Sequence, residues 1–523
     1  MGCRPTTREV PFETLLSLPL RNGLTKPKAQ RGSGVKMISM GELFSSNRIG
    51  CMPMDRVPVT DKELELSCIA PSDLLFARQS LVLEGAGKCS FVKEVSEPTV
   101  FESHLIRARI DRAKAEPEYL YYFFKSPQGR ERIASIVEQV AAAGIRGRDL
   151  ARLSIPCPEL DFQRRVVTLL SCIDNKIDAN AKLNGYLLEL LKASAKNLYA
   201  EYERNEELEL PVGWRWIEVN EICEMVCRGI TPKYNTNSDE TVLGQTCVRN
   251  NLVLLENGRL HSPKKVTEKW LQKYDLLINS TGVGSLGRTA QVWFEPTKLV
   301  VDSHVTIVRC NDKKHALYLG FWAFEHEKYI ESLHTGSTGQ TELPRDHVKA
   351  IRLVLPSDEA LERFNKMSAP SVELIVANQE ESKRLADLRD ALLPKLMSGR
   401  IDVSKIGLTQ LNSHLAEGVQ VINQSAIESD LSPNLANQPF AGKLFVCCSK
   451  SFFGLVELFS VSLFTRPESF FFSCLYRIQD NLVSIYREQK RLISIDELGD
   501  RRFRLTFEHE SRFHRKGLHL IEL

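Results

Sequence analysis

The sequence IDANAKLNGYLLELLKA at residues 177–193 returns in altered form as IVANQEESKRLADLRDA at residues 375–391. Both stretches follow the pattern IxANx6LxxLxxA, and the second begins 198 residues after the first. The same offset relates Pro158 to Pro356, so the register also holds upstream of the motif. A similarity that recurs at a fixed period indicates that one structural unit has been duplicated. The chain is therefore predicted to consist of two copies of a globular segment followed by a helix.

Further matches lie upstream of the helical motif, with small differences in offset that are expected where loops differ in length. The corresponding residues, 200 to 202 positions apart, are Asp73 and Asp275, Ser103-His104 and Ser303-His304, and Arg109 and Arg309. The predicted organisation is two globular domains, 1–158 and 206–356, each followed by a helix, 159–205 and 357–402, with a C-terminal extension of unknown role at 403–523.

Each globular segment is predicted to be a mixed α+β domain. Short runs rich in β-branched and apolar residues, bounded by Gly, Pro and Asn, favour strands. Longer stretches with apolar residues at helical spacing favour helices. The predicted strands are 90–95, 105–110, 290–294 and 304–308, and the predicted helices are 118–136 and 316–333.

The helical segments carry apolar residues at alternating spacings of three and four, which is typical of a coiled-coil seam. The first seam is interrupted at Ser194; in the second, Arg389 is a less apolar member and Pro394 is predicted to kink or end the helix. The seam positions that the two copies share are Ile177, Asn180, Leu187, Ile375, Asn378 and Leu385.

Two asparagines occupy seam positions, where a buried amide needs a hydrogen-bond partner. If the two helices run antiparallel against each other, Asn180 and Asn378 can satisfy one another. The alternative is that each helix packs only on its own domain, but the shared motif favours mutual pairing. A helix over 160–198 would be roughly 60 Å long at about 1.5 Å per residue, so the pair is interpreted as a spacer.

The composition is that of an ordinary globular protein and excludes wholesale disorder and a polytopic membrane protein. Of the 523 residues, 43% are hydrophobic and 26% are charged, and the mean hydropathy is −0.21. The net charge of +3 gives no overall electrostatic footprint for nucleic acid. The 13 cysteines show no paired CxxC spacing, which argues against a zinc site and a disulfide framework. Because the N-terminus carries no apolar signal segment, a cytoplasmic location is expected.

The layout of globular unit, helix, globular unit and helix resembles the DNA specificity subunit of type I restriction-modification systems. Three stretches carry the resemblance over about residues 5–404: LPVGWRWIEVNEICEMVCRGITP at 210–232, DLLINSTG at 275–282 and LRDALLPKLMSGRIDVS at 388–404. No single motif is diagnostic, but their order and duplication together are specific.

The resemblance implies a fold, a function and a set of partners. It implies an α+β protein with two mixed α/β target recognition domains separated by two long helices that form an antiparallel coiled coil. Each domain would read one half of a bipartite, asymmetric site in double-stranded DNA, and the helices would set the spacing and dock methyltransferase subunits. A restriction/translocase subunit would complete the complex. The chain itself would not be an enzyme, and S-adenosylmethionine, ATP and Mg would be bound by the partner subunits.

Contacts to DNA are expected to be local because neither globular segment is strongly basic. Residues 1–158 contain 23 basic and 18 acidic residues, a net charge of +5, and residues 209–356 contain 18 and 17, a net charge of +1. Basic side chains bind phosphates, and Arg and Gln can also read guanine and adenine. The candidate DNA-binding residues are Arg21, Lys26, Lys28, Lys36, Arg146 and Arg148 in the first segment, and Arg228, Lys233, Arg249, Ser337, Thr338 and Gln340 in the second.

Two other motifs suggest chemistry but are predicted to be structural. Gly282 to Thr289 has the spacing of a phosphate-binding P-loop with Arg288 in place of Lys, yet the next residues alternate like a strand, so a glycine-rich hairpin turn is expected. His104 and His304 each lie next to a serine and near an acid. Neighbouring residues on a strand point to opposite faces and cannot form a triad. A framework role, such as a buried hydrogen-bonded histidine, is expected.

Two rival functions remain open at this point. The second hypothesis is a structural adaptor, with two protein-binding domains on a coiled coil and no nucleic acid. The third is an enzyme hidden by sequence divergence. In the C-terminal extension, 444–464 is apolar enough to consider as a membrane span, but Lys450 and Glu457 argue against one. The spacing of apolar residues over 475–492 predicts an amphipathic helix.

Overall fold

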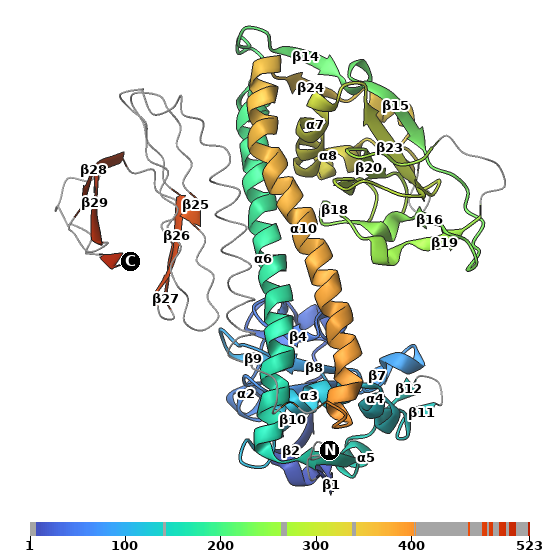
Figure 1. Ribbon diagram of the computed structural model, residues 1–523, viewed down its shortest axis with the longest axis vertical. Helices are drawn as coiled ribbons and strands as arrows, with labels where there is room; N and C mark the ends of the chain where they lie inside the picture. Colours follow the sequence, from blue (N-terminus) through green and yellow to red (C-terminus); the bar gives the residue numbers. More distant parts are fainter. Residues whose placement is uncertain are drawn as a thin grey trace. The chain divides into compact units, whose positions relative to one another are not determined.

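A computed structural model describes residues 7–139, 143–262, 269–336, 341–401 and 403, together with short strands between 459 and 522. The chain divides into two compact units. The first unit comprises residues 1–176 and 387–523, and the second comprises residues 177–386. Helices and strands are mixed in both units, as the sequence predicts (Figure 1).

Two long helices each contribute to both units. Helix α6 runs over Leu160–Arg204 and helix α10 over Asp358–Met397, so each passes through a unit boundary. Pro394 was one predicted end of α10. This prediction is wrong, because the helix continues through Pro394 to Met397. Gly399, with a φ of 65°, follows in the left-handed conformation that commonly terminates a helix, and Arg400 N donates to Lys395 O at 2.9 Å.

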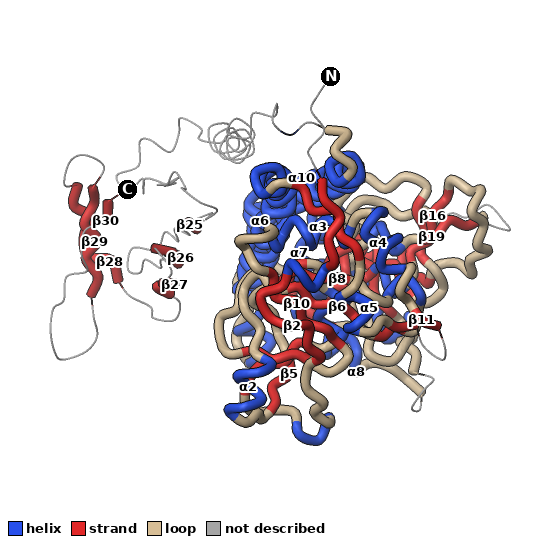
Figure 2. Tube along the Cα trace, turned by 90° about the horizontal axis from the view of Figure 1, so that it is seen from below, coloured by secondary structure: helices blue, strands red, loops and turns tan. Residues whose placement is uncertain are grey.

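The first unit contains a five-stranded sheet in the order β2-β10-β6-β8-β4, and Figure 2 shows β2, β10, β6 and β8 side by side. Smaller sheets join β1 to β13, β5-β3-β9 and β11-β12-β7. The strands are β1 (Thr7–Pro11), β2 (Leu16–Asn22), β3 (Val35–Ile38), β4 (Arg48–Ile49), β5 (Asp55–Val57), β6 (Leu74–Ala77), β7 (Gln79–Ser80), β8 (Cys89–Val92), β9 (Thr99–Phe101), β10 (Leu105–Ile110), β11 (Glu138–Gln139), β12 (Ala143–Gly144) and β13 (Ser154–Pro158). The helices before α6 are α1 (Met40–Ser45), α2 (Asp61–Ser67), α3 (Pro117–Lys125), α4 (Pro127–Ala134) and α5 (Gly147–Ala151).

The second unit repeats the order of four of the five strands of the main sheet. Its main sheet is β15-β23-β20-β21, and smaller sheets join β14 to β24, β19-β16-β22 and β17 to β18. A parallel pair occurs at the same place in each unit, β3 with β9 and β16 with β22. The strands are β14 (Arg215–Glu218), β15 (Cys223–Arg228), β16 (Glu240–Leu243), β17 (Val248–Arg249), β18 (Leu252–Val253), β19 (Arg259–His261), β20 (Leu276–Asn279), β21 (Thr289–Gln291), β22 (Leu299–Val301), β23 (Val305–Cys310) and β24 (Arg352–Leu355), and the helices are α7 (Lys313–Glu325), α8 (Glu327–Ser332) and α9 (Arg345–Lys349).

Each predicted helix of the globular segments is broken into two. The predicted helix 118–136 becomes α3 and α4, separated at Ser126, because Pro127 cannot continue the hydrogen-bonding of α3 and Ser126 instead caps α4 by accepting from Gly129 N at 3.1 Å. The predicted helix 316–333 becomes α7 and α8, separated at His326. The predicted strands at 90–95, 105–110, 290–294 and 304–308 correspond to β8, β10, β21 and β23, with ends that differ by up to three residues.

Both hydrophobic cores include the long helices. In the first unit, Leu170 of α6 and Leu393 and Leu396 of α10 are buried with the aromatic residues of α3. In the second unit, Leu191 and Tyr199 of α6 are buried with residues of α7. Burying large apolar side chains is the main favourable term in folding, so each unit depends on both helices for its stability.

The described part of the C-terminal extension consists of strands. The predicted helix over 475–492 is wrong: β26 (Ser473–Ile478) pairs with β27 (Asn481–Ser484), and β28 (Arg491–Glu497) pairs with β29 (Arg502–Glu508). Tyr476, Ile478 and Val483 are residue types that favour strands, and this preference outweighs the helical spacing. The remaining strands are β25 (Phe459–Ser460) and β30 (Ile521–Glu522). Apart from β25, residues 444–464 lie outside the described residues. Among described helices, none is both long and apolar enough to cross a bilayer.

Candidate nucleic-acid interface and helix pair

The asparagines of the seam hydrogen-bond across the helix pair in the second unit. Asn378 Nδ2 donates to Asn184 Oδ1 at 2.7 Å, and Asn184 Nδ2 donates to Ile375 O at 3.1 Å. Asn180 Nδ2 donates to Glu381 Oε2 at 2.7 Å and Ser382 Oγ at 3.2 Å, and more weakly to Asn378 O at 3.4 Å. The partner positions descend along α10 as they ascend along α6, which is an antiparallel order.

The predicted mutual pairing of the Asn180 and Asn378 side chains is therefore only partly right. The two residues do meet, but through the backbone carbonyl of Asn378, and the side-chain partner of Asn378 is Asn184, one turn further along α6. The reason is geometric, since residues one turn apart lie on the same face of a helix and compete for the same partner. The other seam residues Ile177, Leu187 and Leu385 are partly buried, and Ile375 is fully buried.

In the first unit, a charged residue connects the two helices. Arg389 Nη1 of α10 lies 2.7 Å from Asp174 Oδ1 of α6, and Tyr122 Oη of α3 donates to Asp174 Oδ2 at 2.7 Å. Burial opposes the charge on Arg389, but hydrogen bonds to Asp390 and Asp174 raise its pKa overall. Burial and the adjacent Asp174 raise the pKa of Tyr122 well above its usual value. Arg389 is thus the partner of a buried carboxylate.

An arginine–aspartate pair forms the same framework contact in both units. Asp73 accepts two hydrogen bonds from Arg109 at 2.7 Å each, and Asp275 accepts two from Arg309 at 2.7 Å each. In each pair, the hydrogen bonds to the aspartate raise the pKa of the arginine. These bidentate contacts link β10 to the start of β6 and β23 to the start of β20, and they explain why the sequence matches at these positions.

In the first unit, the structure places the predicted basic residues on strands as well as in a loop. Arg21 lies on β2 and Lys36 on β3, and only Lys26 and Lys28 belong to the intervening segment. Lys26 pairs with Glu63 at 2.9 Å and Lys36 pairs with Glu97 at 2.9 Å, so both charges are partly neutralised. Lys28 is exposed, and no hydrogen bond or ion pair of Arg21 or Lys28 side chains is found among the described residues. Arg21 and Lys28 are therefore the cations of this group available to a phosphate.

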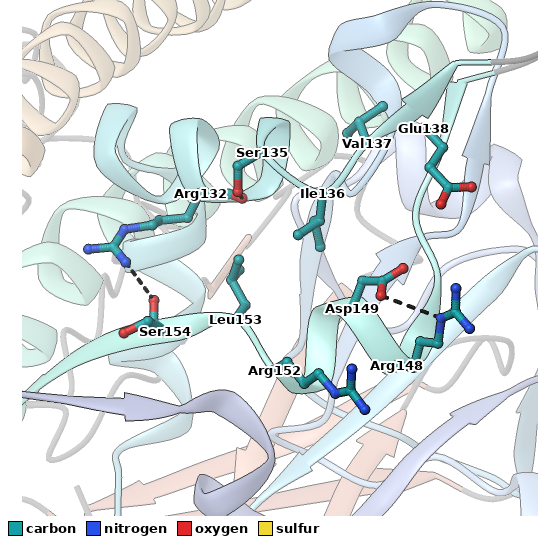
Figure 3. Close-up of a pocket in the computed structure, with 10 residues that line it drawn as sticks. All are labelled: Arg132, Ser135, Ile136, Val137, Glu138, Arg148, Asp149, Arg152, Leu153 and Ser154. Atoms are coloured by element: carbon teal, nitrogen blue, oxygen red, sulfur yellow. Dashed lines mark hydrogen bonds and ion pairs between the residues drawn. The ribbon is translucent and has the colours of Figure 1, made fainter.

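Arg146 and Arg148 are exposed at the start of α5. Arg146 pairs with Glu138, and Arg148 lies 3.5 Å from Asp149. Arg148 and Arg152 border a shallow hollow of about 540 Å³ that Ile136, Val137 and Leu153 also line, and Figure 3 shows Arg148 next to Asp149 in this hollow. The Arg152 side chain has no partner within the described part of the chain, and the sequence analysis did not identify it.

In the second unit, the predicted basic residues differ in whether their side chains are already hydrogen-bonded or ion-paired. Arg228 donates to Leu343 O at 2.9 Å and pairs with Glu342 at 2.8 Å. Its guanidinium therefore joins β15 to the segment that contains Glu342 and Leu343. Lys233 and Arg249 are exposed, and neither side chain has a partner among described residues. Ser337, Thr338 and Gln340 lie outside the described residues.

The structure also brings together a pair that the sequence analysis missed. The guanidinium of Arg259 stacks over the Tyr234 ring, 3.7 Å from its centroid, and donates to the Tyr234 hydroxyl. The Tyr234 side chain is exposed and is adjacent to Lys233 in sequence. The only sequence signal was a tyrosine next to a lysine in a polar loop, because Arg259 lies on β19 and reaches Tyr234 only through the isolated bridge between Tyr234 and His261.

The two motifs that suggest chemistry are structural, although one prediction about them fails. The Gly282 to Thr289 stretch joins antiparallel strands β20 and β21 and opens no helix, as predicted. His104 and His304 are exposed, which contradicts the expected buried histidine, and they lie in turns rather than on strands. Each ring is hydrogen-bonded through Nδ1, His104 to Gln79 Oε1 at 3.0 Å and His304 to Thr281 Oγ1 at 2.8 Å. Neither histidine contacts its adjacent serine, and within the described residues no cluster of His, Cys, Asp or Glu can hold a metal ion.

Sequence comparison finds known proteins that are similar to this chain. The chain is 24% identical over 353 residues to the type I restriction enzyme MjaIX specificity subunit of Methanocaldococcus jannaschii, with 64% of this chain and 80% of that protein covered. The curated relatives of this chain are type I restriction enzyme specificity subunits. Another relative is the putative MjaX specificity subunit of the same organism, 23% identical over 401 residues, with 73% and 91% covered.

Solved structures of type I specificity subunits are also similar. The subunit from M. genitalium matches with a TM-score of 0.46 and 15% identity, covering 76% of this chain and 97% of that one. No protein-family model matches the sequence.

Proposed function

We propose that this chain is the DNA specificity subunit of a type I restriction-modification complex, and that each unit reads one half of a bipartite, asymmetric site in double-stranded DNA. The observation that carries the proposal is that a chain related to specificity subunits contains the same strand order twice. Outside the matched framework residues, the two units differ in sequence. Two equal scaffolds with unlike surfaces suit two different half-sites.

The helix pair is proposed to be an antiparallel coiled-coil spacer that sets the gap between the half-sites. Its support is the asparagine ladder from Asn180 to Asn378 in the second unit and the pair of Asp174 with Arg389 in the first. Buried polar contacts in a helix seam commonly fix the register of the helices at some cost in stability. A fixed register is what a spacer of constant length requires.

The methyltransferase subunits are proposed to dock on the outer surface of these helices. In the second unit, Tyr186, Leu190 and Met367 are exposed on α6 and α10, and each is large and apolar. Tyr186 and Leu190 are one turn apart and therefore share a face of α6. Exposed apolar groups on a polar helix are typical of partner interfaces. A restriction/translocase subunit would join through the assembled complex.

In this proposal, phosphate contacts supply affinity and the unpaired basic residues make them. The best-placed residues are Arg21, Lys28, Arg152, Lys233, Arg249 and the Arg259–Tyr234 stack. Methyl transfer, with S-adenosylmethionine, and DNA translocation, with ATP and Mg, belong to the partner subunits in this proposal.

A methylome tests the proposal directly. The chain is expressed with its methyltransferase partner in cells that lack other adenine methylation, and methylated positions are mapped. A two-part motif with a constant gap is the expected result. Sequence-selective mobility shifts of the purified complex would agree with it. Absence of both, with intact assembly of the subunits, would instead support a structural adaptor that binds only proteins.

A further inference from the structure

The hairpin that follows the third strand of the main sheet carries exposed apolar side chains in both units. We name residues 78–88 the first tip loop and residues 280–288 the second tip loop. In the first, Leu81 is 99% exposed, Val82 59% and Leu83 49%; in the second, Val283 is 86% exposed. The loops join β6 to β8 and β20 to β21, so they are topologically equivalent.

Backbone hydrogen bonds fix the base of each tip loop in the same way. In the first unit, Arg78 N donates to His104 O at 2.8 Å and Ile145 N donates to Arg78 O at 2.9 Å. In the second, Ser280 N donates to His304 O at 2.8 Å and Leu343 N donates to Ser280 O at 2.8 Å. The base of each loop is thus held between two neighbouring segments. The apolar side chains are therefore exposed on loops whose backbone is fixed by hydrogen bonds.

Glycines raise the apolar residue of the second tip loop away from the protein. Val283 lies between Gly282 and Gly284, whose φ angles of 90° and 72° are in the left-handed region that side chains disfavour. Leu286 N donates to Gly282 O at 3.0 Å, which closes the turn below Val283. Leu286 is buried and packs the loop against the protein, whereas Val283 remains exposed to solvent.

The surroundings of the first tip loop are largely basic, whereas the base of the second tip loop lies beside Glu327 and Glu342. Arg130 donates to the carbonyl oxygens of Glu84 and Ala86 at 2.8 and 3.2 Å, and Arg78 donates to Ser103 O at 3.3 Å. The single charge within the second tip loop is that of Arg288. The first tip loop also pairs, through β7 and β12, with the segment that leads to Arg146. In the first unit, a positive rim around an apolar tip complements a duplex, which has an anionic backbone and an apolar base stack.

The size of the second tip favours DNA over a protein as its partner. Protein docking patches span on the order of several hundred Å² of contiguous apolar surface, and one valine between two glycines offers far less. A single projecting apolar side chain suits insertion at a base step, where such wedges partly unstack the bases. We propose that Leu81 and Val283 are apolar wedges, each of which enters a groove of the bound duplex and unstacks one base step of the half-site that its unit reads. This inference rests on the proposed function.

The test uses the complex of this chain with its methyltransferase subunits and a duplex that contains the methylated motif. 2-Aminopurine, whose fluorescence rises on unstacking, replaces bases one at a time in each half-site. The methylated adenine and its direct neighbours are left out, because methyltransferases flip their target base out of the stack. Wild type is expected to give a rise at one step in each half. Val283→Thr, which keeps the shape but adds a hydroxyl, should abolish the rise in one half only, and Leu81→Asn should abolish it in the other. Val283→Ile should retain it.

A matched control and an affinity measurement complete the design. Val212 is 99% exposed and lies outside both tip loops, so Val212→Thr should leave the fluorescence and the affinity unchanged. Val283→Thr should weaken DNA binding about fourfold, the change that corresponds to losing the burial of roughly one methyl group.

The outcomes separate this inference from the proposed function. Sequence-selective binding with no rise in wild type, or with a rise that persists in both tip variants, overturns the wedge and leaves the proposed function standing. Loss of methyltransferase assembly in the tip variants also overturns it, because the tips would then bind protein. If wild type binds no DNA selectively, both proposals fail together.

Discussion

Arg389 Nη1 of α10 lies 2.7 Å from Asp174 Oδ1 of α6, although the two residues are 215 positions apart in sequence. Asp174 also accepts the Tyr122 hydroxyl, so one carboxylate connects three helices of the first unit. The side chain of Asp174 is 5% exposed and that of Arg389 is 15% exposed. The contact is therefore shielded from solvent, unlike most ion pairs of the chain.

Removing Asp174 should destabilise the first unit strongly. Asp174→Ala leaves Arg389 and Tyr122 without their buried partner, and breaking a pair of this kind costs about 3–5 kcal/mol. Denaturant unfolding of the full chain measures the loss. The control is Asp390→Ala, which removes the other, 62% exposed partner of Arg389 and should cost less than about 1 kcal/mol. Equal effects of the two substitutions would contradict the structural role given to Asp174.

The asparagine ladder should show energetic coupling between the two helices. Asn378→Ala removes the donor that satisfies Asn184 Oδ1, and Asn184→Ala removes the acceptor. Each single change should cost about 1–3 kcal/mol because a buried amide group is left unpaired. A double-mutant cycle should give a coupling energy of at least about 0.5 kcal/mol. Asn197, exposed on α6, is the control, and a cycle of Asn197 with Asn378 should give none.

Salt dependence should distinguish the unpaired cations from the paired ones. Lys233→Ala and Arg249→Ala each remove an exposed cation without a partner among the described residues, so each should lower the slope of log affinity against log salt by about 1. Arg228→Ala should instead lower the thermal stability of the second unit, because Arg228 joins β15 to the segment of Glu342 and Leu343. Unchanged slopes in both lysine and arginine variants would exclude these residues from the DNA interface.

Acid should weaken the second unit partly through His315. Burial, assisted by Lys314, lowers the pKa of this histidine below 6.5, and its Nδ1 has no hydrogen-bond partner in the described structure. A lowered pKa means that the unfolded chain binds the proton first, so the contribution is complete above about pH 6.5 and is lost as the pH falls through the folded-state value. His315→Gln should therefore lose less unfolding free energy than wild type between pH 7.5 and 5.5. Parallel pH profiles would contradict this assignment.

The repeat and the seam could be predicted because they depend on local spacing alone. The IxANx6LxxLxxA motif requires no knowledge of the partner, and it located both long helices within a few residues of their ends. The choice of Asn184 as the partner of Asn378 depends on how far one helix slides along the other. Pairing Asn378 with Asn180 or with Asn184 preserves the same spacing of seam residues, so the sequence pattern does not distinguish these two partners.

The other differences between the sequence-based predictions and the structure arise from partners that are distant in sequence. Arg389 is a less apolar member of the seam in the sequence, and its role depends on Asp174, which lies 215 positions away. The fold likewise supplies acidic partners to Lys26, Lys36 and Arg228, which the sequence shows only as basic residues. A basic residue identified by type alone cannot be assigned to an interface until its neighbours are known. The sequence does not reveal the apolar tip loops for a similar reason, since Val283 lies within a stretch that has the spacing of a nucleotide-binding loop.

The division of α10 between the two units has a consequence for biosynthesis. Leu393 and Leu396 are buried in the core of the first unit, yet they follow the whole second unit in the chain. At about 5–20 residues per second, the ribosome adds them on the order of ten to forty seconds after residue 176. The part made first must therefore wait with an open apolar surface until the last helix arrives. Chaperone dependence during translation, and aggregation of nascent chains truncated before residue 387, are the costs of this chain order.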